Sequence, residues 1–322
     1  MTSQTPQAGT VALTGATGFV GGHIARRLAA GGWRVRALVR RPLQDSALGD
    51  LGELVTPVQG ALDSPAALSE LVAGADAVVH CAGLVAARRR SEFHAVNGIG
   101  TARLAEAAAA APGAPRFLLI SSLAAREPGL SPYAASKREA EDLLRRKAEG
   151  LSWQVLRPPV VYGPGDRATL DLFRQFARGF ALIPGGAGRF SMIYVEDLAA
   201  AVEALLQASP PEPHIIELDD ARPGGYAWAD VVAAAERQLG RRVRSLAVPG
   251  PLLRLVAGIS SGMAMLTGRA SVLSQGKVNE IAHPDWVCRS NLLGDLVPWR
   301  PLVAFEEGFS RTLAWYKAAG WL

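Results

Sequence analysis

The chain has 322 residues, of which 49% are hydrophobic and 20% are charged, an ordinary composition for a globular protein with a sizeable core. Its 34 basic and 29 acidic side chains give a formal net charge of +5, and the arginines are scattered rather than clustered, which argues against a nucleic-acid surface. The two cysteines, Cys81 and Cys288, lie far apart, so they predict neither a disulfide framework nor a zinc site, and no metal is expected.

The beginning of the chain is polar and lacks the charged and then apolar pattern of a signal peptide, which favours a cytoplasmic location. Residues 248–266 are the most apolar later stretch, but Pro249, Pro251 and Arg254 interrupt it. A bilayer crossing needs about twenty uninterrupted apolar residues, so no span is expected there. Three alternatives stay open for this stretch: burial in the core, the lining of a hydrophobic pocket, and contact with the inner face of a membrane. For the protein as a whole, a homodimer also stays open.

Residues 11–28 combine an apolar strand, a glycine-rich turn and an amphipathic helix. Gly15 can adopt a turn that a Cβ forbids, Gly18 allows close approach of a ligand, and Gly21 lets the helix pack against the strand. Free N–H groups at the helix start would then face an anion. We therefore expect a dinucleotide phosphate to be bound by Gly15, Thr17, Gly18, Phe19 and Val20.

The next strands predict the rest of a dinucleotide site. A strand over residues 34–39 ends on Arg40, which suits the 2′-phosphate of NADP, although a plain surface arginine is the alternative. The third strand ends near Leu62 and Asp63, where the adenine ring is expected. A fourth apolar strand, over residues 77–83, ends in the small residues that would let the cofactor pass, namely Cys81, Ala82 and Gly83.

Strands alternate with helices through this part of the chain. Helices are predicted over residues 66–72 and 101–111, and a fifth strand over residues 117–120. This alternation predicts an α/β fold with a Rossmann-type, doubly wound parallel sheet. NADP(H) is the favoured cofactor, with NAD(H) as the alternative.

Tyr133 and Lys137 are four residues apart in a segment of strong helix formers, so the phenol and the ammonium share one helix face. A nearby cation lowers the pKa of a phenol toward the range in which it can carry protons. Ser122, just after the fifth strand, could hold the same substrate oxygen. Each residue also has a plain structural alternative: an aromatic ring in the core, a solvated charge and a cap. Behind a nucleotide loop, the three predict a proton relay beside a hydride carrier.

Five motifs occur in order: Thr-Gly-Ala-Thr-Gly-Phe-Val-Gly at 14–21, His-Cys-Ala-Gly at 80–83, Ser-Ser at 121–122, Tyr-x-x-x-Lys at 133–137, and Leu-Arg-Pro-Pro-Val-Val-Tyr-Gly-Pro-Gly-Asp at 156–166. They resemble the extended short-chain dehydrogenases/reductases of the NAD(P)-dependent epimerase/dehydratase superfamily, in its hydroxysteroid dehydrogenase and ketolipid reductase branch. The resemblance covers residues 11–206 and the last helix, near residues 306–316.

This resemblance implies roles for individual residues. Tyr133 would be the catalytic acid and base, Lys137 its pKa-lowering partner that also binds the nicotinamide ribose, and Ser122 the hydroxyl that positions the oxygen. Asn97 would support the catalytic residues. The nicotinamide would be edged by Pro158 and the backbone that follows it, including Val160.

Departures from the family pattern narrow the chemistry. Nucleotide-sugar epimerases carry asparagine where this chain has Val160, and arginine where it has Phe190, with Arg189 one place off. Sugar dehydratases carry Asp-Glu where Leu123 and Ala124 stand. We therefore expect NADP(H)-dependent hydride transfer to or from a ketone or secondary alcohol of a hydrophobic, lipid- or steroid-like substrate, for example a ketosphingoid or ketoceramide. A nucleotide-sugar 4-epimerase and a cofactor-binding structural subunit of a membrane complex are the alternatives.

After residue 164 the alternation becomes irregular, and glycine and proline mark loops. A Rossmann domain is expected over residues 8–164 plus 191–212, and a smaller, mostly helical substrate-binding domain over 165–190 plus 213–322. His283, Trp286 and Trp299 are expected to be packing residues. The substrate pocket is expected to involve residues 85–90, 123–130 and 251–266, with Phe173, Phe180, Leu182, Ile183 and Phe190.

Overall fold

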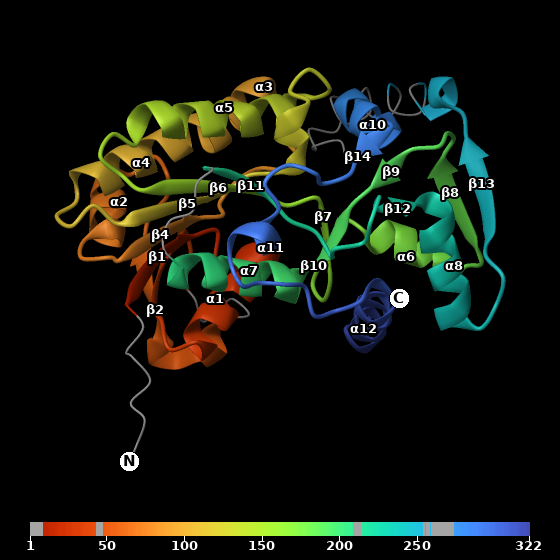
Figure 1. Cartoon of the computed structure of the whole chain (residues 1–322), viewed down its shortest axis with the longest axis horizontal. Coiled ribbons are helices and arrows are strands. Elements are labelled where there is room, and N and C mark those ends of the chain that lie inside the picture. The colour runs from red at the N-terminus through yellow and green to blue at the C-terminus, as the bar shows by residue number, and fades with distance from the viewer. Residues whose placement is uncertain (1–8, 43–47, 209–213, 254, 256–257, 259–273) are drawn as a thin grey trace, which may run out of the picture.

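The computed structural model describes residues 9–42, 48–208, 214–253, 255, 258 and 274–322. Its main feature is a seven-stranded parallel sheet in the order β11-β6-β5-β4-β1-β2-β3, with helices on both faces (Figure 1). The predicted fold class is therefore confirmed. The strands are β1 (Thr10–Thr14), β2 (Arg34–Val39), β3 (Val55–Gln59), β4 (Ala77–His80), β5 (Arg116–Ile120), β6 (Trp153–Arg157) and β11 (Ile215–Glu217).

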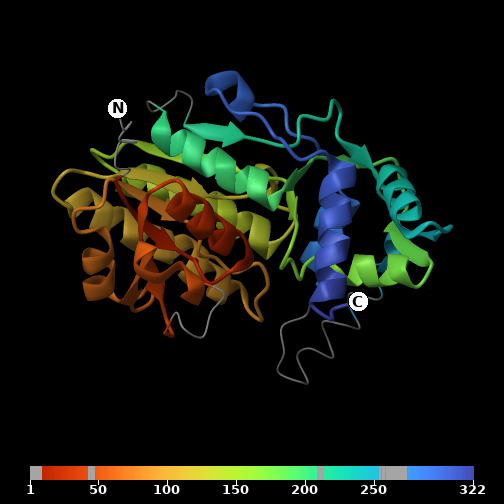
Figure 2. The ribbon, with the colours of Figure 1, turned by 90° about the horizontal axis from the view of Figure 1, so that it is seen from below.

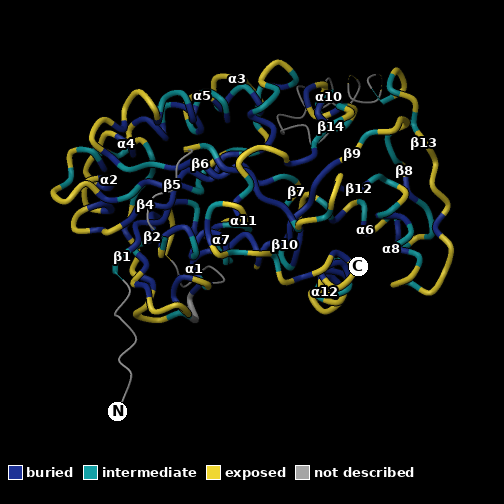
Figure 3. Tube along the Cα trace, in the orientation of Figure 1, coloured by how far each residue is buried: buried dark blue, intermediate teal, exposed yellow. Residues whose placement is uncertain are grey.

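Two helical layers cover the sheet, so its central strands are apolar and lie dark blue, that is buried, in Figure 3. One layer is α1 (Phe19–Ala30) with α7 (Val195–Gln207), which lie side by side in Figure 2. Their contact buries Leu28 and Val202 in one core with the sheet. The other layer is α2 (Pro65–Val72), α4 (Gly100–Ala110) and α5 (Pro132–Lys147).

The helix expected from residue 101 begins earlier. It runs without interruption from α3 (Arg90–Phe93) through a π-helical segment (His94–Ile99, η3) into α4. A π segment shifts the phase of the side chains that precede it and is frequent at functional sites. Two short 3₁₀ helices, η2 (Gly49–Leu54) and η4 (Leu123–Arg126), complete this half of the molecule.

A smaller lobe lies beyond the carboxyl ends of the main strands (Figure 1). Its small sheets have the orders β10-β7, β12-β9-β14 and β13-β8. An aromatic core fills it, in which Phe173 stacks on Phe309 with ring centroids 4.6 Å apart. The elements are β7 (Val160–Tyr162), α6 (Leu170–Ala177), β8 (Phe180–Pro184), β9 (Arg189–Phe190), β10 (Met192–Tyr194), β12 (Tyr226–Ala227), α8 (Trp228–Leu239), β13 (Arg244–Val248), α10 (Gln275–Ala282), β14 (Asp285–Trp286) and α12 (Phe305–Ala318).

The boundary placed after residue 212 does not follow the sheet. β11 lies in the range expected for the substrate-binding domain, but it pairs with β6 as the seventh parallel strand. Leu293, in the short helix α11 (Leu293–Leu296), and Val297 also pack into the core beneath the main sheet. Segments from the last third of the chain therefore complete the nucleotide-binding half.

The apolar stretch 248–266 falls mainly outside the described residues. Within the described part, Leu252 is 49% exposed and Leu255 is 61% exposed. None of the helices in the described ranges combines the length and apolar character that a bilayer crossing requires.

Candidate active site

A cavity of about 490 Å³ lies where the carboxyl ends of the main strands face the smaller lobe. It extends from the start of α1, past the ends of β4 and β5, to α5 and α10. Open parallel sheets place ligands at this edge. The predicted site residues that line the cavity are Phe19, Val20, Cys81, Gly83, Ser122, Tyr133, Lys137, Pro158 and Val160.

The glycine loop at the start of α1 fits a dinucleotide phosphate. Gly15 has a φ of +77°, and a Cβ there would lie 2.7 Å from the backbone nitrogen of Ala82. A Cβ on Gly21 would lie 2.6 Å from the carbonyl carbon of Gly15, so helix and loop approach closely. Gly18 is the N-cap of α1 and no side chain caps the helix there, which leaves its first N–H groups available to an anion.

The other predicted cofactor residues lie outside the cavity. Thr17, Arg40 and Asp63 are exposed, and the carbonyl of Arg40 accepts a hydrogen bond from Gln59 Nε2 at 3.0 Å. Leu62 lies against Gly100, where an added Cβ would be 2.8 Å from Leu62 Cδ1. Their roles in cofactor binding stay predictions.

The structure brings Ser122, Tyr133 and Lys137 together. Ser131 caps α5 by accepting a hydrogen bond from the N–H of Ala134 at 2.9 Å, which fixes Tyr133 and Lys137 in the first two turns. Lys137 is 7% exposed, and its Nζ donates to the carbonyl of Ile120 at 3.0 Å, at the end of β5. Ser122 lies two residues further on and lines the cavity beside Tyr133, near enough to act against the rise in the pKa of its phenol. Its Oγ also accepts from the N–H of Ala124 at 3.2 Å, so the capping role is real as well.

Burial raises the pKa of the Tyr133 phenol to about 12, although the interaction with Ser122 lowers it. Burial also lowers the pKa of Lys137. The expectation that Lys137 brings the phenol pKa toward neutrality is therefore not met in this structure, because desolvation outweighs the favourable contacts. At neutral pH the phenol carries its proton and can donate it.

Asn97 lies in the π segment, and its side-chain amide makes three hydrogen bonds. Its Oδ1 accepts from the N–H of Leu84 at 2.7 Å, and its Nδ2 donates to the carbonyl of Leu84 at 3.0 Å and to Ser136 Oγ at 2.8 Å. The amide therefore ties the loop after β4 to the residue next to Lys137. Asn97 is not among the residues that line the cavity.

His80 joins Asn97 to the nucleotide loop, a role that sequence reasoning missed. Thr14 Oγ1 lies 2.6 Å from His80 Nδ1, and Thr101 Oγ1 lies 3.0 Å from His80 Nε2. Thr101 gives its hydroxyl hydrogen to the carbonyl of Asn97 at 2.6 Å, so it accepts from His80 Nε2–H, and Thr14 donates to Nδ1. Burial, with a smaller contribution from the Lys137 charge, lowers the pKa of His80 to about 3, so the ring is neutral.

The smaller lobe contributes residues that no local pattern indicated. Glu280 and Lys277 on α10 line the cavity, and so do His283 and Trp286, which were expected only to pack. The last two rings lie 4.6 Å apart, so they pack on each other as well. These residues reach the site through contacts far apart in sequence, for which the sequence carries no local signal.

The predicted substrate pocket is right in part. Val85, Leu123, Ala124 and Phe190 line the cavity. Phe173 instead belongs to the aromatic core, which follows from its stacking on Phe309. The predicted residues of β8 do not reach the cavity either, because that strand pairs with β13 at the far side of the lobe; they are Phe180, Leu182 and Ile183.

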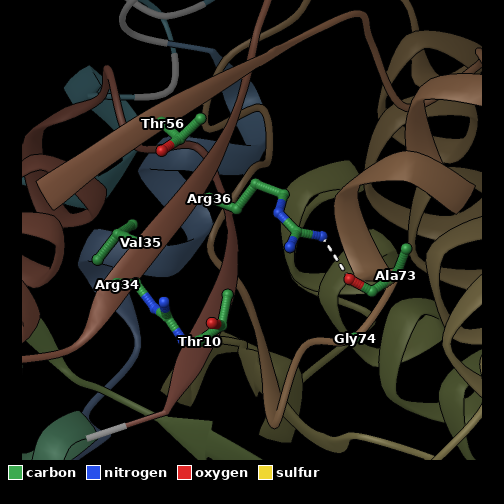
Figure 4. Close-up of a pocket in the computed structure, with 7 residues that line it drawn as sticks. All are labelled: Thr10, Arg34, Val35, Arg36, Thr56, Ala73 and Gly74. Atoms are coloured by element: carbon green, nitrogen blue, oxygen red, sulfur yellow. Dashed lines mark hydrogen bonds between the residues drawn. The ribbon is translucent and has the colours of Figure 1, made fainter. Parts of the chain in front are cut away.

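A second hollow, of about 420 Å³, lies at the opposite edge of the sheet (Figure 4). Arg36 lies in it, and its Nη1 donates to the carbonyls of Glu70, Leu71 and Ala73 at 2.6 to 3.0 Å. The guanidinium thus caps the end of α2, a structural role. No group of three or more metal-ligating side chains gathers in the described part of the chain.

The doubly wound sheet, the glycine loop and a cavity that joins this loop to a serine, a tyrosine and a lysine define an NAD(P)-dependent oxidoreductase of the extended short-chain type. Residues 11–218 match the model of the NAD dependent epimerase/dehydratase family, and the chain belongs to this family.

The relatives that cover nearly the whole chain include a reductase and an epimerase. A protein named ceramide reductase from Caulobacter vibrioides (strain NA1000 / CB15N) is 43% identical over 315 residues, which are 98% of this chain and 96% of the relative. A UDP-glucose 4-epimerase from Vibrio cholerae is 25% identical over 334 residues, 94% of each chain. The solved structure of MoeE5 in complex with UDP-glucose and NAD shares the fold, with a TM-score of 0.70 at 22% identity over 97% of this chain and 99% of that one.

Proposed function

We propose that this protein is an NADP(H)-dependent reductase of a hydrophobic, lipid-like ketone. The observation that carries the proposal is the cavity in which Ser122, Tyr133 and Lys137 face an apolar wall. An apolar wall beside a few polar groups suits an aliphatic substrate better than a sugar diphosphate. The 43% identical relative named ceramide reductase supports the same class. The wall includes Leu172, Phe190, Met192, Trp228, Val231 and Ile281.

In the proposed reaction each residue has a chemical task. The glycine loop holds the pyrophosphate, and Lys137 and Tyr133 hold the nicotinamide ribose. The cofactor supplies the hydride for the carbonyl carbon when it is bound. Ser122 donates a hydrogen bond that orients the carbonyl oxygen, and Tyr133 gives its phenolic proton to that oxygen as the alkoxide forms. The ammonium of Lys137 stabilises the phenolate that remains.

Two cations in the cavity wall are already paired with protein groups, which weighs against their binding the diphosphate of a nucleotide sugar. Arg189 donates from Nε and Nη2 to the carbonyls of Gly224 and Gly225, at 2.5 and 2.8 Å. Lys277 donates to Glu280 Oε2 at 3.2 Å. Both cations therefore already have partners. This supports the sequence-based prediction that the contacts of epimerases with a sugar diphosphate are missing here. The Vibrio cholerae relative keeps 4-epimerisation as the second candidate. The relay of Ser122 and Tyr133 weighs against a purely structural subunit, which needs no proton donor.

The reaction is tested with Tyr133→Phe and a panel of long-chain ketones and UDP-sugars. We expect wild-type protein to oxidise NADPH in the presence of a ketone, and the variant to lose roughly 10²–10⁴-fold of that turnover. Its NADPH affinity should fall far less, because the glycine loop and Lys137 still hold the cofactor. Unchanged turnover in the variant would remove Tyr133 as the proton donor. A thermal shift with a UDP-sugar but with none of the ketones would favour the epimerase.

The preference for NADP rests on Arg40, at the end of β2. We expect NADPH to bind about tenfold more tightly than NADH, because a guanidinium pairs with a phosphate in two hydrogen bonds. Arg40→Asp should reverse the order, while Arg34→Asp, at the other end of the strand, should leave it unchanged. Cofactor fluorescence titration measures both affinities. Tighter NADH binding by the wild type would refute the role of Arg40.

A cytoplasmic location, a peripheral membrane contact and a homodimer stay predictions. The membrane prediction depended on residues 248–266, most of which lie outside the described ranges.

A further inference from the structure

A buried carboxylate forms part of the otherwise apolar wall that the smaller lobe contributes. Glu280, on α10, is 7% exposed, and it lines the same cavity as Tyr133. Taking a charge out of water costs free energy unless hydrogen bonds and counter-charges replace the water. A carboxylate in such a place therefore needs either a structural or a ligand-binding explanation.

The structural contacts of Glu280 are few and fix its position. Its Oε1 accepts from the hydroxyl of Ser131, the N-cap of the helix that carries Tyr133, and its Oε2 accepts from Lys277 Nζ at 3.2 Å. Gly276 permits the close approach of α10, since a Cβ there would lie 2.7 Å from Ser131 Cβ. The carboxylate is thus held rigidly relative to the catalytic phenol.

These contacts leave acceptor capacity on the carboxylate. Its two oxygens offer about four lone-pair directions, and the described side chains donate once to each oxygen. Burial is the main cause of the raised Tyr133 pKa, and the charge of Glu280 adds to it. Glu280 also accepts from Ser131, two residues before Tyr133, and both residues line one cavity, so a substrate whose carbonyl meets Tyr133 occupies a space that Glu280 borders.

We propose that Glu280 is a substrate-binding residue that accepts a hydrogen bond from a neutral donor, an amide N–H or a hydroxyl, that the substrate carries next to its reacting carbonyl. The inference rests on the proposed ketone reduction and narrows its substrate class. Lys277 already sets a positive charge against the carboxylate, which favours a neutral donor over an ammonium group. The aliphatic part of the substrate would lie on the apolar wall.

The test compares matched long-chain ketones in the wild type, Glu280→Gln and Glu280→Leu. One ketone carries an acylated amino group on the carbon beside the carbonyl, the second has a methylene in place of its N–H, and the third has a free ammonium. Asp285→Asn, which changes a carboxylate paired with Arg289 outside the cavity, is the control. Glu280→Gln keeps the shape and one acceptor oxygen, so it tests the charge with the least disturbance of Ser131.

We expect the wild type to prefer the acylamino ketone about tenfold in kcat/KM. Glu280→Gln should lose most of that preference, mainly through KM, and change turnover of the methylene ketone less than about twofold, because a hydrogen bond to a charged acceptor is roughly twice as strong as one to a neutral acceptor. Asp285→Asn should keep the preference. An equal loss on all ketones would mean that Glu280 only anchors α10, and a preference for the ammonium ketone would also overturn the inference.

Binding is measured separately from turnover. Trp228 and Trp286 line the cavity, so titration of tryptophan fluorescence reports the affinity for each ketone without any reaction. If no ketone is reduced, the proposed function fails, and the affinity ratio between the acylamino and methylene ketones still decides the role of Glu280. Reduction of both ketones with equal affinities would retain the function and refute the role of Glu280.

Discussion

His80 couples the end of β1, just before the glycine loop, to α4 from a fully buried position. Its two ring nitrogens bond the hydroxyls of Thr14 and Thr101, and Thr101 in turn bonds the carbonyl of Asn97. A buried polar network of this kind stabilises a structure only when every member is satisfied. Protonation of the ring would reverse the bond with Thr14, because the charged ring has two donors and no acceptor; the Thr14 hydroxyl, which already accepts from the N–H of Ala82, would then have to accept from Nδ1–H as well.

The position of His80 predicts acid sensitivity. Its pKa is about 3 in the folded protein, below the ordinary value of 6.5, so the unfolded chain binds more protons between these values, and stability falls as the pH drops through this window. At about pH 5 the loss from this group is about 2 kcal/mol. Urea unfolding at about pH 7.5 and about pH 5 measures it, and His80→Gln should flatten the difference. A histidine ring NMR titration that places His80 near its ordinary pKa would contradict this.

Single residues differ in how far the sequence predicts them. Tyr133 and Lys137 were predictable because their geometry is local: four residues make one helical turn. The pKa of the Tyr133 phenol was not predictable, since desolvation depends on everything packed around it. Glu280 lies 147 residues after Tyr133 and in no motif, so only the folded chain reveals it.

The first βα unit shows how narrowly one element is built. A Cβ at Gly21 would overlap the backbone of Gly15, whereas a Cβ at Gly22 would lie 3.4 Å from the carbonyl oxygen of Ala16, an ordinary contact. Close packing therefore requires glycine at position 21 but not at position 22. The glycine spacing predicted this close packing at Gly21 correctly.

Alanine substitutions at these two glycines should have opposite effects. Gly21→Ala should destabilise the protein by about 1–3 kcal/mol and weaken NADPH binding, because the loop must move away from the helix. Gly22→Ala should stabilise it by about 0.5–1 kcal/mol, because alanine loses less backbone entropy in a helix. Urea unfolding and cofactor titration measure both variants. Equal effects of the two substitutions would mean that the loop position does not depend on contact with Gly21.

At the scale of the whole molecule, the fold class followed from rules that act between neighbouring elements. Parallel strands joined by helices have few ways to pack, so the alternation in residues 11–206 was enough to predict the fold class. The smaller lobe was not predictable in detail. Its strands include pairs of two residues, such as β9 with β14, whose partners lie almost a hundred residues away. A strand of two residues is too short to show the alternation of apolar and polar residues by which strands are recognised.

The chain crosses repeatedly between the two halves. It leaves the main sheet after β6, returns with α7 and β11, leaves again, and returns with Leu293 before α12 closes the aromatic core. During synthesis, the nucleotide-binding half therefore lacks part of its interior until almost the entire polypeptide has emerged from the ribosome. Neither half can be excised or exchanged as an independent module without opening apolar surface in the other.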